Sequence, residues 1–329
     1  MGTTVAFPHQ QPPGYEWLGD ETPFDPTRHL QLEPPESIIR LDALGYAPDA
    51  IATKASPIAV SSPFRVLSDE GAALLLDTAR RLRAFAHPAG DRIECMTRGG
   101  CYRSKWLRDF CVSRDVTEHL ATVYEVDVAP HAMPLHLGHL NFDPPVAEKP
   151  VDKWHHDTLA LDYVLMVTDP AKVAGGAFEY FLGTKADAAA YAERQEPFPT
   201  ERVVKPHFPG PGYAVALHGD MVVHHVAPLT APCERITLVN GYTSTDPMND
   251  EQSRTVDLIG VDDHACLYTE WAKFAAWRSH GRLRNLIDSL EYNRDPHEVA
   301  DQLQNAIDDV QRAIDDMRAG ERPISHYET

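Results

Sequence analysis

The feature that most limits the folds open to this chain is a series of short apolar segments separated by turns. The segments span residues 159–167, 177–182, 212–217, 221–226 and 235–242. Most of the connections between them are short and contain Gly, Pro or Asp, and short connections can join only antiparallel strands. The pattern therefore predicts a mainly β domain with added helices (α+β), built as an antiparallel sandwich or jelly roll.

The regions on either side of this stretch predict helices and an irregular N-terminal arm. Residues 1–62 are rich in proline and have little periodicity, whereas the chain after residue 262 has helical spacing. We therefore predict a single domain over residues 1–329. Its parts would be an N-terminal arm (1–62), helical support (63–130), a β core (131–245) and C-terminal helices (262–320).

Several elements can be placed individually. Ser68, an acidic first turn and apolar residues at spacings of three and four predict an amphipathic helix that ends near His87. Residues 133–142 predict a strand that enters the core, and residues 186–193 predict a small helix in a polar insertion. Apolar residues between 303 and 317 alternate spacings of four and three. This stripe predicts a C-terminal helix packed on its own domain, with a homodimer seam as the alternative.

Composition excludes several classes of partner and location. The formal charge of -19 argues against a nucleic-acid surface and against binding to an anionic membrane. The sequence contains no run of about 18 apolar residues, so we expect no membrane span. The N-terminus lacks the basic and apolar regions of a secretion signal. The five cysteines form no C-x-x-C pair, so we expect reduced thiols and a cytoplasmic protein.

The clearest chemical signal is a His-x-Asp pair, His155 and Asp157, followed later by His224. On a strand, residues i and i+2 point to the same side, so the pair would share one face. A second strand at residues 221–226 could bring one more histidine to the same place. Two imidazoles and one carboxylate, with the remaining positions open, are the ligand set of a non-haem Fe(II) oxygenase.

Two observations weigh against this interpretation. Buried histidines are often ordinary hydrogen-bonded core residues, and His155 and His224 could be of that kind. In addition, His-x-Asp also occurs at His218 and Asp220. There the intervening glycine indicates a turn between two strands rather than a pair of metal ligands.

The same stretch resembles the Fe(II)/2-oxoglutarate-dependent oxygenases, most closely their phytanoyl-CoA dioxygenase-like branch. The shared motifs are WHHD at 154–157, GGAFEYFLGTK at 175–185 and GDMVVH at 219–224, and the resemblance covers roughly residues 130–245. The family's G-S-H-like end is Gly-Thr-Lys here, at 183–185, and a long insertion follows it. This departure leaves the subfamily and the substrate open.

The resemblance implies a double-stranded β-helix with a metal centre between its two sheets. It implies that Fe(II) is held by His155, Asp157 and His224. It further implies that 2-oxoglutarate chelates the iron, that O2 takes the last position, and that Arg235 and Thr237 bind the far carboxylate of 2-oxoglutarate. Arginine suits this role because its planar fork can donate two hydrogen bonds to one carboxylate.

The family motif also bears on the choice of ligand and on the type of reaction. Its form H-x-V-x-P assigns the ligand position to His224 and turns His225 to the other face of the strand. Retention of Asp157 implies hydroxylation or a related oxidation, because related halogenases have a small residue at this position. The expected substrate is a small molecule, such as an amino acid or a secondary metabolite.

Substrate contacts are less well specified. His139 and Asn141 share one face of the predicted strand at 133–142 and could line the pocket, or they could be hydrogen-bonded residues near its mouth. Arg103, together with Arg98 and Arg108, could bind a substrate carboxylate, although a charged loop is usually solvated.

A second function class stays open at this point. A metal-dependent cupin enzyme, such as an isomerase or a dioxygenase that uses its substrate as the chelator, would have the same metal ligands without 2-oxoglutarate. A catalytically silent binding protein on the same fold is a third alternative. Arg235 and Thr237 distinguish the first two classes, because only the oxygenase requires a carboxylate-binding pair behind the metal.

Overall fold

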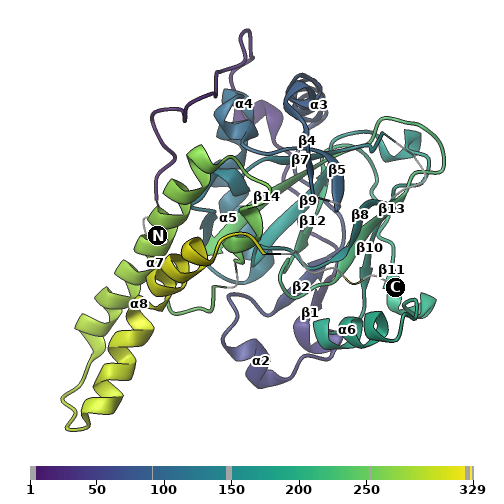
Figure 1. The fold of residues 1–329 in the computed structure, drawn as a ribbon. Helices are drawn as coiled ribbons and strands as arrows, with labels where there is room; N and C mark the ends of the chain where they lie inside the picture. The colour runs from purple at the N-terminus through teal and green to yellow at the C-terminus, as the bar shows by residue number, and fades with distance from the viewer. Residues whose placement is uncertain (1–4, 91, 146–149, 252, 323–326, 328–329) are drawn as a thin grey trace.

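The computed structural model describes residues 5–90, 92–145, 150–251, 253–322 and Tyr327, and it consists of two β-sheets with helices around them (Figure 1). The pairings between its named strands are antiparallel. The protein is therefore mainly β with added helices, as predicted, and its two sheets form a jelly roll. In the described part of the chain, no helix is both long and apolar enough to cross a membrane.

The larger sheet has the strand order β1-β2-β12-β9-β14-β7-β5-β4, with β3 beside β12 and β6 beside β14. Its strands are β1 (Ile38–Arg40), β2 (Ile58–Ser61), β3 (Phe64–Arg65), β4 (His87–Ala89), β5 (Ile93–Thr97), β6 (Val128–Pro130), β7 (His139–Phe142), β9 (Leu161–Met166), β12 (Tyr213–Leu217) and β14 (Ile236–Ser244). The smaller sheet has the order β11-β10-β13-β8. Its strands are β8 (Pro150–His155), β10 (Phe178–Phe181), β11 (Val203–Val204) and β13 (His224–Pro228).

The helices are α1 (Pro26–His29), α2 (Pro48–Ala52), α3 (Asp69–Leu82), α4 (Lys105–Cys111), α5 (Arg114–Tyr124), α6 (Lys185–Glu193), α7 (His264–Ser289) and α8 (Pro296–Ala319). Helices α3, α4 and α5 pack on the larger sheet, α6 packs on the smaller sheet, and α7 and α8 form a C-terminal hairpin (Figure 1). Helix α3 begins as predicted, because the hydroxyl of Ser68 accepts a hydrogen bond from the backbone N–H of Gly71. It continues into a 3-10 turn at Arg83–Phe85, close to the predicted end.

Strand β9 shows how the layers form the core. All six of its residues are buried. Leu161, Tyr163 and Leu165 pack with residues of α3, α4 and α5 on one face. Val164 and Met166 pack with residues of the smaller sheet on the other face. Because both faces are covered, this strand is apolar in the sequence except for Asp162.

The structure corrects several expected elements. Residues 1–62 are not only an arm, because β1 and β2 pair with each other and β2 joins β12 in the larger sheet. Residues 133–142 do not form one strand, because Pro134–His136 is a 3-10 turn and β7 starts only at His139. Helix α4 has no counterpart among the predictions. These elements are too short to show a periodicity in the sequence.

Helices α7 and α8 form a hairpin that projects from the sheets (Figure 1). Helix α8 packs on α7 through Ala306, Asp309 and Ala313, which are buried. The predicted stripe packs only in part: Val310 and Met317 pack against the cluster that contains Ala313 and residues of α7, whereas Leu303, Ile307 and Ile314 are exposed. Small residues beside the stripe complete the contact, because they allow the two helices to approach closely. The homodimer through this helix stays a prediction.

Candidate metal centre

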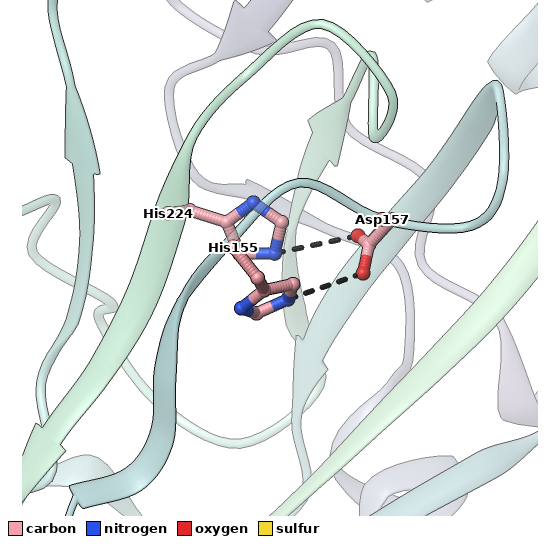
Figure 2. Close-up of side chains that lie close together, drawn as sticks. All are labelled: His155, Asp157 and His224. Atoms are coloured by element: carbon pink, nitrogen blue, oxygen red, sulfur yellow. Dashed lines mark hydrogen bonds and ion pairs between the residues drawn. The ribbon is translucent and has the colours of Figure 1, made fainter. Parts of the chain in front are cut away.

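His155, Asp157 and His224 meet at the edge of the smaller sheet (Figure 2). His155 is the last residue of β8, and His224 is the first residue of β13 and lies directly opposite it. His155 Nε2 is 3.2 Å from Asp157 Oδ1, and His224 Nε2 is 3.3 Å from Asp157 Oδ2. One nitrogen or oxygen from each residue lies within 4.8 Å of the others. Two neutral imidazoles and one carboxylate at this spacing can hold a divalent metal ion.

Two of the three side chains, those of His155 and His224, come from strands, whereas Asp157 does not. Strand β8 ends at His155, so Asp157 lies beyond the strand, and the expectation that both share one strand face is wrong. Asp157 is instead positioned by a turn, in which its backbone N–H donates to Gly219 O at 2.8 Å. Strand β13 likewise begins at His224 rather than at residue 221.

Both imidazoles are oriented by backbone carbonyls. His155 Nδ1 is 2.6 Å from Lys153 O, and His224 Nδ1 is 3.0 Å from Val222 O. A carbonyl only accepts hydrogen bonds, so we assign the proton to Nδ1 in each ring and the lone pair to Nε2, which faces Asp157. Carbonyl partners of this kind fix the orientation of metal-binding histidines.

The electrostatics of the centre suit a metal ion. Burial, and next the charge of Arg92, lower the pKa of His155 to about 4. Burial lowers the pKa of His224, but the charge of Asp157 outweighs it and the net pKa is raised. Burial raises the pKa of Asp157, but His224 and His155 outweigh it and hold the net pKa well below its usual range. The negative carboxylate and the two imidazoles therefore attract one another across the space in which a cation would bind.

His225 faces away from the centre, as predicted. Its Nε2 is 3.0 Å from Glu179 Oε2, and its ring stacks on Trp154 with 3.8 Å between ring centroids. This packing fixes the register of β13, so His224 and not His225 belongs to the candidate centre.

The turn that carries Gly219 requires glycine. A Cβ at this position would lie 2.2 Å from Asp162 Oδ2 and 2.9 Å from Asp157 Cβ. The second His-x-Asp pair flanks this glycine, and Asp220 binds Lys185 and Arg254 at 3.1 Å each. Asp220 therefore anchors the turn, in agreement with the interpretation of this pair as structural.

A cavity of about 870 Å³, counted out to its open mouth, adjoins the three side chains and lies between the two sheets. The predicted substrate residues His139 and Asn141 both line it. Among the described residues, His139 Nε2 and Asn141 Oδ1 have no hydrogen-bond partner. His136, which the sequence did not single out as a candidate for the site, lines the cavity too and has no partner at either ring nitrogen within the described chain.

The predicted role of Arg103 is wrong. Arg103 is not part of the cavity wall, because its guanidinium lies over the rings of Phe85 and Tyr15, 3.9 and 4.4 Å from their centroids. Of its two neighbours in the basic loop, Arg108 pairs with Asp109 outside the cavity, and only Arg98 lines it. The arginines point in different directions because a 3-10 turn and helix α4 interrupt the loop.

Arg235 and Thr237 lie next to the cavity, where Arg235 immediately precedes β14 and Thr237 is its second residue, so the strand begins one residue later than predicted. Thr237 lines the cavity and pairs across the sheet with Asn141. Arg235 is fully buried, and its Nε donates to Gly176 O at 2.7 Å. Its Nη1 is 3.4 Å from Thr237 Oγ1, and its Nη2 has no partner among the described residues. Burial lowers the pKa of Arg235 to about 10, so the guanidinium remains charged at neutral pH.

Gly176 explains how Arg235 fits. A Cβ on Gly176 would lie 2.8 Å from Arg235 Cδ, and the backbone has a φ of +60° there. Both facts require glycine at this place. The GG turn of the sequence motif is thus the surface on which the arginine side chain lies.

Comparisons with known proteins found similarity in three-dimensional structure only. No protein-family profile matches the chain, and no curated protein sequence matches it. Three solved structures illustrate the similarity found. AviO1 from Streptomyces viridochromogenes Tue57 has 18% identity and a TM-score of 0.42, with 63% of this chain and 96% of that chain covered. EctD from S. alaskensis with bound Fe has 15% identity and a TM-score of 0.41, with 68% and 86% covered.

The third is the non-heme alpha ketoglutarate dependent epimerase SnoN from nogalamycin biosynthesis. It has 15% identity and a TM-score of 0.41, with 56% of this chain and 76% of that chain covered. Similarity at this level assigns neither a family nor an activity. A function must therefore be inferred from the residues of the centre.

Proposed function

We propose that this chain is an Fe(II)- and 2-oxoglutarate-dependent oxygenase that oxidises a small molecule and releases succinate and CO2. The observation that carries the proposal is the combination of His155, Asp157 and His224 with Arg235 and Thr237 beside one cavity. The motifs at 154–157 and 219–224 favour the phytanoyl-CoA dioxygenase-like branch. The five cysteines are free thiols, which fits a cytoplasmic location.

The donor set fits Fe(II). Imidazole nitrogen and carboxylate oxygen suit this ion, and three protein ligands on one side leave the remaining positions open for other molecules. His155, Asp157 and His224 would hold the metal. Since His155 and His224 are buried and oriented by backbone carbonyls, they need little rearrangement to bind it.

Arg235 fits the far carboxylate of 2-oxoglutarate. A buried donor without a partner costs about 1–3 kcal/mol, and more when it is charged, so Nη2 of Arg235 favours an acceptor in the adjoining space. A carboxylate would provide it and would also neutralise the guanidinium. The hydroxyl of Thr237 can donate a further hydrogen bond. A site that bound only a metal ion would have no need of this buried pair.

The protein's own part in the reaction is orientation and exclusion of water. When bound together, Fe(II), 2-oxoglutarate and O2 supply an oxidant strong enough to abstract hydrogen from the substrate. Arg235 and Thr237 would orient the cosubstrate with its keto acid toward the metal ligands. Apolar side chains such as Ile93, Met96 and Leu258 line the cavity and limit its hydration. We propose that His139 and Asn141 contact the substrate.

The decisive experiment measures succinate formation by the purified protein with Fe(II), 2-oxoglutarate and candidate metabolites, together with 2-oxoglutarate binding in the absence of oxygen. The oxygenase should bind 2-oxoglutarate only when the metal is present. If the metal-loaded protein binds no 2-oxoglutarate, the metal-dependent cupin enzyme without this cosubstrate takes the place of the oxygenase.

A further inference from the structure

Arg92 connects the two sheets at the candidate metal centre. It immediately precedes β5 of the larger sheet, and its partner Asp152 lies on β8 of the smaller sheet. Its Nε donates to Asp152 Oδ1 at 2.7 Å and its Nη2 donates to Asp152 Oδ2 at 3.0 Å. The exposed fractions of the two side chains are 16% and 5%, so this is a largely buried pair. Such a pair is strong enough to hold the guanidinium in one place.

The same guanidinium approaches a candidate metal ligand. Nη2 of Arg92 is 3.6 Å from Asp157 Oδ1. Oδ1 also lies 3.2 Å from His155 Nε2, and the other oxygen, Oδ2, lies 3.3 Å from His224 Nε2. The two oxygens of Asp157 are therefore not equivalent, because only Oδ1 has a fixed positive charge beside it.

This asymmetry matters because Asp157 lies beyond the end of its strand. A carboxylate can bind a metal ion through one oxygen or through both. Binding through both would use a further coordination position, which the proposed reaction needs for the cosubstrate or for dioxygen. The backbone hydrogen bond from Asp157 N–H to Gly219 O does not decide between the two modes.

We propose that Arg92 is a positioning residue that keeps Asp157 a one-oxygen ligand by drawing Oδ1 toward its guanidinium, and so leaves space beside the metal for 2-oxoglutarate. The inference rests on the proposed function. It assigns to Arg92 an effect on the geometry of the metal site, whereas a purely structural role would affect only the stability of the sheet contact.

The test replaces the whole pair, so that no buried charge is left alone. Arg92→Gln leaves the carboxylate of Asp152 buried without its partner, which would destabilise the fold. The double variant Arg92→Gln/Asp152→Asn removes both charges and keeps the net charge beside the metal constant. Because Asp152 Oδ1 also lies 3.5 Å from His155 Nδ1, Asp152→Asn alone measures the part of any spectral change that comes from Asp152, and this part should be the smaller one. The matched control is Arg98→Gln/Asp262→Asn. This pair also lines the cavity wall through Arg98, with bidentate distances of 2.6 and 2.8 Å, and in the described part of the chain it forms no hydrogen bond or ion pair with a candidate metal ligand.

Co(II) serves as the probe, because it has the charge of Fe(II) and a visible spectrum that reports its coordination. The Arg92/Asp152 variant should bind Co(II) about as tightly as the wild type but with an altered visible spectrum. Its turnover should fall about 10- to 100-fold, the usual effect on activity of removing a partner of a metal ligand, and its affinity for 2-oxoglutarate should fall as well. The single variant Arg92→Lys, which keeps Asp152, should lose less affinity for 2-oxoglutarate than the double variant, because the ammonium group keeps the positive charge. The control variant should leave both the Co(II) spectrum and the affinity for 2-oxoglutarate unchanged.

Two results would overturn the inference. The first is a wild-type Co(II) spectrum in the Arg92/Asp152 variant, since this would mean that Asp157 binds in the same way without Arg92. The second is an equal spectral change in the control variant, since this would mean that any lost ion pair in the cavity has the same effect. Failure of wild-type protein to bind 2-oxoglutarate would refute the proposed oxygenase, and the Co(II) spectrum would still decide the role of Arg92.

Discussion

Arg235→Ala is the substitution that tests the proposed cosubstrate most directly. Arg235 lies outside the group of candidate metal ligands, so the affinity for Fe(II) should change little. In the wild type, Nη2 is buried without a partner among the described residues, and Nη1 has only the distant contact with Thr237. Both nitrogens can therefore donate to one carboxylate of 2-oxoglutarate.

The size of the effect follows from the burial of Arg235. Loss of one partner of a desolvated, hydrogen-bonded charge pair costs roughly 2–5 kcal/mol. Because Thr237 remains in the variant and can still donate one hydrogen bond, we expect the lower half of this range, roughly 2–3.5 kcal/mol, or about 30- to 400-fold in affinity. Arg235→Lys should recover part of it, because an ammonium group restores the charge but not the planar fork.

The assay follows succinate formation against 2-oxoglutarate concentration, with the iron content measured alongside. The KM for 2-oxoglutarate should rise, and high concentrations should recover part of the turnover. Arg80→Gln is the matched control, because Arg80 pairs with the neighbouring Glu234 at 2.9 and 2.7 Å on the exposed surface. An unchanged KM in Arg235→Ala would refute the assignment of this arginine to the cosubstrate.

Three further predictions concern the histidines and Asp157. His155→Ala or Asp157→Ala should abolish turnover and weaken Fe(II) binding, because each removes one of three ligands; full activity of either variant would contradict the ligand set. His224→Ala should lose iron and His225→Ala should retain it, which metal analysis of the two purified variants will show. Burial, and next two lysine charges, lower the pKa of His218 to about 3, so the unfolded chain binds its proton first as the pH falls below about 6.5. Between pH 7 and pH 5, His218→Leu should therefore lose about 2 kcal/mol less of its free energy of unfolding than the wild type loses. Urea unfolding at the two pH values measures this difference, and equal losses in the two proteins would contradict it.

The sequence was sufficient for predictions that depend on local pattern. Residues 161–166 are buried on both faces of a sheet, and this burial appears in the sequence as a run that is apolar except for Asp162. The family motif assigned the ligand position to His224, and strand alternation then turned His225 to the other face, since a shift of one residue would exchange the two faces. Alternation also places Arg235 and Thr237 on the same side of the chain, because they are two residues apart. Arg235 immediately precedes β14, and Thr237 lies within it.

Only the tertiary structure decided which distant groups meet at the centre. Asp157 reaches the histidines through a turn that is held by the backbone of Gly219, so strand alternation could not place it. Arg92 is brought to Asp157 because the edges of the two sheets meet, and no spacing along the chain records that meeting. Arg103 could not be told from Arg98 in the sequence, because the turn between them decides which side chain enters the cavity. Contacts between sheets depend on the packing of the whole domain, whereas local periodicity reports only which face of each element is covered.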